Sequence, residues 1–92
     1  MEQLTFQAKD GWLRVKFVLG VENGKVKEVE YTAARCKTLR SLADTLKDAL
    51  AGVDVDRIKD VARETLAGID LPENRENRRR LLLKAFGVED GR

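Results

Sequence analysis

The 92-residue sequence contains no histidine, one cysteine and few aromatic residues, which make up 5% of the chain. Without histidine, neither a zinc finger nor a Ser-His-Asp catalytic triad can form. A single cysteine cannot form an internal disulfide bond, so nothing in the sequence indicates secretion. No apolar run approaches the roughly 20 residues that cross a membrane, and the N-terminal residues do not resemble a signal peptide. These absences predict a cytoplasmic protein that does not enter a membrane.

Charged residues make up 37% of the chain and hydrophobic residues 42%, which is enough apolar material for a folded domain. The 18 basic and 16 acidic residues leave a net charge of +2, and this balance does not by itself indicate nucleic-acid binding. The length predicts one domain over residues 1–92. No acid–base or nucleophile–base pair can be assembled from the sequence, so we do not expect an enzyme.

Apolar and polar side chains alternate in three segments of the first third of the chain. This period of two is typical of half-buried strands, and turn-forming residues separate the segments. The segments are residues 4–8, 13–19 and 29–33, with turns at residues 10–11 and 22–24. The pattern predicts a three-stranded antiparallel meander with one apolar face.

The loop at residues 22–24 decides which residues of the second and third strands face each other. A two-residue Asn-Gly loop would set Leu19 opposite Glu28 and mix apolar with charged positions. A three-residue loop with its glycine in the left-handed conformation would set Phe17 opposite Val29 and keep one face apolar. We therefore predict the three-residue loop.

After Cys36 the apolar residues recur every three to four positions, which is typical of amphipathic helices. Three such stretches cover residues 39–50, 58–66 and 72–86, and a glycine follows each of them. Strands followed by helices predict an α+β fold in which all three helices pack on one face of the sheet. The last five residues, 88–92, are expected to fray.

Gly24 of the Asn-Gly-Lys turn precedes Cys36 by twelve positions, and Gly52 follows Cys36 by sixteen. This spacing resembles that of the iron–sulfur cluster assembly scaffolds, namely the IscU proteins and the N-terminal domain of NifU. In that family an Asn-Gly-Lys turn precedes a cysteine by twelve residues, and a glycine ends the following helix sixteen residues later. Gly24, Cys36 and Gly52 have this spacing, and a last helix after Pro72 also matches. The resemblance implies the same α+β fold and a role related to iron–sulfur cluster assembly.

The family holds its [2Fe–2S] cluster with three cysteines and an aspartate, because cluster iron prefers thiolates. Where the family has Cys-Gly-Asp, residues 10–12 read Asp-Gly-Trp. The family's third cysteine lies early in the last helix, in an Arg-x-x-Cys or His-Cys pattern, and residues 75–80 there read Arg-Glu-Asn-Arg-Arg-Arg, without a thiol. The resemblance therefore leaves Cys36 as the single thiol ligand for sulfur or iron, with Asp10 as an oxygen ligand. No cofactor is expected in the isolated monomer, and a cluster or iron would need further ligands from a partner.

Cys36 has two interpretations. It lies between Arg35 and Lys37 at the start of a helix, and both features favour the reactive thiolate form. The alternative is a small, half-buried residue without reactivity. The sequence leaves both open.

The last helix carries a run of basic residues with two interpretations. Arg75, Arg78 and Arg79 would share one face, where they would meet phosphates or an acidic protein. The alternative is a solvated face that nearby glutamates neutralise. No aromatic residue is interleaved with this run, so nucleic acid is the less favoured partner. Trp12, on the polar side of its predicted strand, would either mark a contact surface or pack at the edge of the sheet.

Our first hypothesis is a NifU/IscU-like protein related to iron–sulfur cluster assembly, with a degenerate site that retains one cysteine. The alternative is a protein-interaction module without a cluster on the same fold, and a small nucleic-acid binder is a third. In either of the first two, the partner is an assembly component or a second copy of the chain. The predicted contact surface comprises Trp12, Arg35, Lys37, Arg75, Arg78 and Arg79.

Overall fold

The computed structural model describes residues 1–88 as a three-stranded antiparallel sheet followed by three helices. The strands are β1 (Glu2–Asp10), β2 (Leu13–Glu22) and β3 (Lys25–Ala33), and they pair in chain order. The helices are α1 (Lys37–Leu50), α2 (Ile58–Ala67) and α3 (Glu76–Ala85), with short 3₁₀ turns η1 (Val55–Arg57) and η2 (Glu73–Arg75) before the last two. The predicted α+β fold is confirmed.

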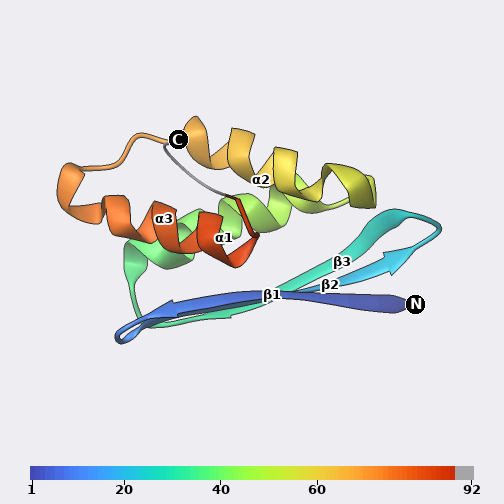
Figure 1. The fold of residues 1–92 in the computed structure, drawn as a ribbon, viewed down its shortest axis with the longest axis horizontal. Coiled ribbons are helices and arrows are strands. Elements are labelled where there is room, and N and C mark those ends of the chain that lie inside the picture. The colour runs from blue at the N-terminus through green and yellow to red at the C-terminus, as the bar shows by residue number, and fades with distance from the viewer. Residues whose placement is uncertain (89–92) are drawn as a thin grey trace.

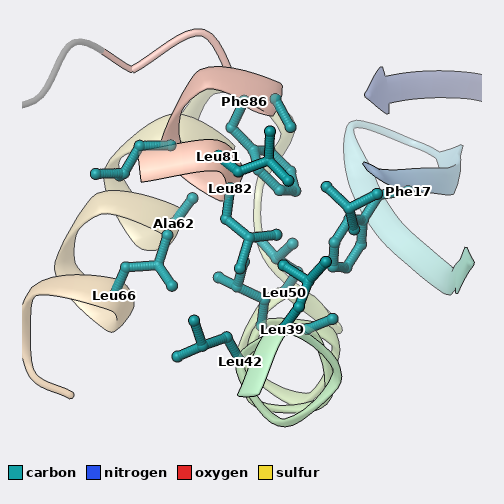
Figure 2. Packing of buried hydrophobic residues seen from close by; sticks show 14 of the residues in the cluster. Phe17, Leu39, Leu42, Leu50, Ala62, Leu66, Leu81, Leu82 and Phe86 are labelled. Carbon is teal, nitrogen blue, oxygen red and sulfur yellow. The ribbon is translucent and has the colours of Figure 1, made fainter. Parts of the chain in front are cut away.

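All three helices lie on one side of the sheet, and its other face is uncovered (Figure 1). Helix α1 packs on β3, and helix α3 packs on β1 and β2. The main contacts of α2 are with α1 and α3, because its buried stripe of Ile58, Ala62 and Leu66 faces those helices (Figure 2). The helices therefore form two layers, and only the inner pair touches the strands extensively.

The turn between β2 and β3 differs from the predicted three-residue loop. Asn23 and Gly24 form a two-residue turn, and both have left-handed φ angles, 56° and 77°. Two left-handed residues define the type I′ turn, which suits the twist of a β-hairpin. The predicted pairing of Phe17 with Val29 is wrong, because Phe17 lies opposite Tyr31 instead.

A β-bulge explains why the short turn still leaves one face of the sheet apolar. Val21 pairs with Val26, whereas Gly20 pairs with Glu28, so Lys27 is an extra residue on β3. The extra residue shifts the phase of β3 by one position. Beyond the bulge, Leu19 therefore lies opposite Val29, and the apolar side chains share one face as predicted.

The core joins the sheet to all three helices through fully buried leucines and phenylalanines. Phe86, which directly follows α3, lies against Phe6 and Phe17, with ring centroids 4.8 and 5.2 Å away. Figure 2 shows Phe86 and Phe17 among the leucines of this core. Val88 is only 9% exposed and its N–H donates to the carbonyl of Leu83. The predicted fraying is therefore wrong for Val88, and the rest of that prediction concerns residues 89–92, outside the described part of the chain.

Candidate functional site

The β1–β2 turn, the β3–α1 connection and the start of α3 lie together at one end of the molecule (Figure 1, left). Cys36 occupies the connection, with extended backbone angles, φ −135° and ψ 116°, and it caps the N-terminus of α1. Its Sγ accepts a hydrogen bond from the backbone N–H of Leu39 at 3.4 Å. The thiol is therefore part of the start of the helix, and the residue is only 8% exposed.

Arg78 reaches Cys36 from the first turns of α3, although 42 residues separate them in the chain. Its Nε donates to Cys36 Sγ at 3.4 Å, and its Nη1 donates to Oδ1 of Asn77 at 2.8 Å. Arg78 belongs to residues 75–80, the region in which the family resemblance implies a third cysteine, and an Arg-x-x-Cys pattern that begins at Arg75 would end at Arg78. The fold thus brings Cys36 into contact with this region, and the contact is made by a guanidinium.

The environment of Cys36 acts on its ionisation in two directions. Burial raises the pKa of the Cys36 thiol, but the hydrogen bond and positive charge of Arg78, with the N–H groups of Leu39 and Thr38, hold the pKa below its usual value. The sequence neighbours Arg35 and Lys37 are exposed. The cation that contacts the sulfur is therefore supplied by α3, from the arginine run that the sequence showed without linking it to Cys36.

The predicted basic face of α3 is divided between internal and external roles. The guanidinium of Arg79 forms two parallel hydrogen bonds with the carboxylate of Glu76, at 2.9 and 3.0 Å. The same group donates to the carbonyl of Leu66 in the last turn of α2 and, at 2.7 Å, to that of Ile69, two residues beyond the helix. Its side chain is only 15% exposed. Arg79 therefore joins α2 to α3, and little of it is left for a partner.

The Glu76–Arg79 pair also shifts the ionisation of both groups. The hydrogen bond from Arg79 holds the pKa of the Glu76 carboxyl below its usual value, and the same bond raises the pKa of Arg79. Arg75 is half-buried in η2, and Arg80 is exposed. The basic run therefore does not form one continuous surface.

Asp10 and Trp12 lie at the β1–β2 turn. Asp10 pairs with Leu13 at the end of the hairpin and is exposed. Gly11 has φ 63°, as expected for the first central residue of a type II′ turn. Trp12 follows it in the turn, 61% exposed, and not on the strand as predicted. Neither residue completes a metal site, because residues 1–88 contain no group of three or more Asp, Glu, His or Cys side chains suited to a metal ion.

An open groove of about 910 Å³ lies at the same end of the molecule. Its lining includes exposed side chains of the uncovered sheet face, from all three strands, and Arg35 at the beginning of the β3–α1 connection. Arg40 of α1 also lines it and donates to the carbonyls of Ala33 and Ala34, both at 3.1 Å. We call it the basic groove, since five of its twelve lining residues are cationic: Lys9, Arg14, Lys16, Arg35 and Arg40.

Comparisons with known proteins do not place the chain in a family. Neither a protein-family model nor a curated protein sequence matches it. The resemblance to NifU and IscU therefore rests on the residue spacing and on the α+β element order. Within residues 1–88 no helix is both long enough and apolar enough to cross a membrane.

Replacing Arg78 with methionine is expected to raise the pH at which Cys36 becomes reactive, because the hydrogen bond and charge that favour the thiolate are lost. Iodoacetamide alkylation measured against pH separates two effects. The midpoint reports the pKa of the thiol, and the plateau rate reports access to the sulfur. In the unmodified protein we expect a midpoint below that of glutathione and a lower plateau, because Cys36 is buried.

Arg80→Met is the matched control, because it removes an exposed arginine from the same helix. Its alkylation midpoint should equal that of the unmodified protein. Equal midpoints for the Arg78 and Arg80 variants would contradict the assigned contact.

Proposed function

We propose that this protein is a divergent NifU/IscU-like cytoplasmic domain that holds no cluster by itself and serves as a binding module. The contact between Arg78 Nε and Cys36 Sγ carries the proposal. A guanidinium is permanently cationic and has no lone pair available for iron. Arg78 thus puts a positive charge where the resemblance calls for a thiolate.

The remaining donors support the same conclusion. Each iron of a [2Fe–2S] cluster needs two protein ligands beside the bridging sulfides, and thiolates are the usual ones. Cys36 is the only thiol in the chain, and its sulfur already accepts two hydrogen bonds. Asp10 is the only other ionisable ligand at a family position, and it lies exposed in the hairpin turn region. These residues do not fit the cluster.

The proposed contact surface lies at the same end of the molecule as the degenerate site. Trp12 is the one large aromatic side chain among residues 1–88 that is mostly exposed, and exposed aromatic residues often anchor binding partners. Arg35 lines the same groove as Trp12, and Arg35 and Lys37 are both exposed, one on each side of Cys36. A protein partner, either an assembly component or a second copy of the chain, would meet this surface.

A second candidate function is the acceptance of sulfur or iron at Cys36 with ligands from a partner. The lowered pKa of the Cys36 thiol favours it, because the thiolate is both the nucleophile and the metal ligand. Arg78 would have to move away from the sulfur for a partner's ligands to reach it. This candidate function requires a partner that supplies ligands beside Cys36. The binding module, in contrast, requires no reaction and no ligand at Cys36.

Anaerobic reconstitution with ferrous iron and sulfide tests the proposal. The purified monomer is expected to show no visible cluster absorption after desalting, and no more bound iron than a Cys36→Ser variant. The variant is the matched control because it removes the only thiol and changes one atom. A stoichiometric cluster that survives desalting in the unmodified monomer, and is absent from the variant, would refute the cluster-free proposal.

A further inference from the structure

We infer that the basic groove binds single-stranded nucleic acid, with phosphates on its lysines and arginines and a base stacked on Trp12. The groove is lined by exposed side chains of the uncovered sheet face, and Arg40 of α1 closes it at the β3–α1 end. The inference goes beyond the proposed protein-binding function, because it assigns the groove beside Trp12 a ligand of another class. It does not depend on whether Cys36 can hold iron.

The charge of the groove indicates an anionic ligand. Lys9 of β1 lies directly opposite Arg14 of β2, and Lys16 is two residues further along β2. Like charges in opposite positions of a sheet are destabilising. Among the described residues no ion pair involves these three cations, and no acidic residue lines the groove. Bound phosphates would offset the repulsion between these three cations, which no acidic side chain of the groove offsets.

The exposed indole distinguishes nucleic acid from other polyanions. Trp12 lines the groove, lies in the two-residue β1–β2 turn and is 61% exposed. Single-strand-binding proteins combine a positively charged groove with aromatic rings on which bases stack. An acidic peptide would match the charges but offers no flat ring to the indole. Gln7 and Thr32 lie directly opposite Lys16 on the two neighbouring strands and add polar groups that can meet base edges.

The geometry favours a single strand over a duplex. In a duplex the bases are stacked on each other inside the helix, so Trp12 could not stack on one without unpairing it. A single strand can follow the sheet surface and turn one base onto the ring. The ligand class is therefore single-stranded DNA or RNA, recognised through phosphates and a base without a required sequence.

The test uses the full chain and labelled single-stranded oligonucleotides of about 12 nucleotides, oligothymidylate and oligouridylate. Fluorescence anisotropy measures affinity against salt concentration. Trp12 is the only tryptophan, so quenching of its emission reports stacking directly. We expect binding that weakens with salt and quenches Trp12. Trp12→Ala should weaken binding by about 5- to 150-fold, the range of base–aromatic stacking energies.

Charge variants separate the groove from the net charge of the protein. Lys16→Gln should weaken binding and reduce the slope of log affinity against log salt by about 0.7, the contribution of one phosphate on a single strand. Lys47→Gln is the matched control, because it removes an exposed lysine from the last turn of α1, outside the groove. Its affinity and slope should stay close to those of the unmodified protein.

Three results would overturn the inference. The first is tighter binding to a duplex than to a single strand, and the second is equal losses in the Lys16 and Lys47 variants. The third is no oligonucleotide binding at low salt. If a polyglutamate peptide still bound in that case and lost affinity in the Lys16 variant, the groove would be a protein-binding surface and the proposed binding module would stand. Failure of both ligands would leave the groove without an anionic partner. A stable cluster would refute only the cluster-free proposal.

Discussion

Replacing Phe86 with alanine is expected to lower the free energy of unfolding by about 3–5 kcal/mol. The side chain is fully buried, stacks on Phe6 and also contacts Phe17, so it joins the end of α3 to two strands. Removing the ring leaves a cavity between the sheet and the helices in addition to the lost burial of apolar surface. Native domains are stable by only about 5–15 kcal/mol, so the variant should be close to unfolding at room temperature.

Urea denaturation followed by circular dichroism measures this loss. Phe86→Leu is the graded control, because it keeps most of the apolar volume and should cost less than the alanine variant. Trp12→Ala removes an aromatic ring from an exposed turn and should change stability by less than about 0.5 kcal/mol. A Phe86→Ala variant as stable as the Trp12 variant would show that Phe86 does not hold α3 on the sheet.

The second large effect is a gain of cluster binding in the triple variant Asp10→Cys, Trp12→Asp and Arg78→Cys. These changes restore the three family ligands that the resemblance assigns to these positions, beside the retained Cys36. Residue 78 already lies in hydrogen-bond contact with the sulfur of Cys36, and residues 10 and 12 belong to the turn at the same end of the molecule. Reconstitution should then yield about two iron atoms per chain and visible thiolate-to-iron absorption.

The control for this gain of cluster binding places the third cysteine at residue 80 and leaves Arg78 unchanged. The Asp10→Cys, Trp12→Asp and Arg80→Cys variant contains the same number of thiols, but its third cysteine lies at an exposed position of α3. It should bind iron loosely and lose it on desalting. If the Arg78 variant is folded and retains no more iron after desalting than this control, the NifU/IscU resemblance does not extend to the geometry of the site.

The two reconstitution experiments test different statements. The unmodified monomer tests whether the present residues can hold a cluster, and the triple variant tests whether the fold still presents the ligand positions. If the unmodified monomer binds no cluster and the triple variant binds one, the results would support a NifU/IscU-like fold that has lost its cluster site. Two negative results would leave the binding function without a link to iron–sulfur proteins.

The sequence by itself determined the order and type of the elements. Alternating apolar residues such as Leu13, Val15 and Phe17 all lie on the buried face of β2, and Leu39, Leu42 and Leu46 all lie on the buried face of α1. These patterns are local, because the periods of a strand and a helix alone decide which side chains share a face. The spacing of Gly24 and Cys36 likewise predicted a turn followed by a strand and a helix start, where both residues are found.

The pairing of β2 with β3 needed the tertiary structure. The choice between a two-residue and a three-residue loop depended on whether an extra residue could be placed in β3, and the bulge at Lys27 does so. The bulge lets the apolar side chains of β3 share one face with those of β2. No pattern in the residues around Lys27 predicts that a bulge forms there. The sequence therefore predicted the correct face with the wrong partners.

Only the tertiary structure decided what surrounds the candidate sites. Arg78 meets Cys36 across 42 residues, and Arg79 turns inward to the end of α2. The basic groove collects cations from β1, β2, the β3–α1 connection and α1. In the sequence these cations are scattered, and the one visible run of arginines is divided by the fold. Contacts between distant segments depend on how whole helices and strands pack, and no local pattern encodes that packing. The surroundings of Cys36 and of the basic groove are made of such contacts.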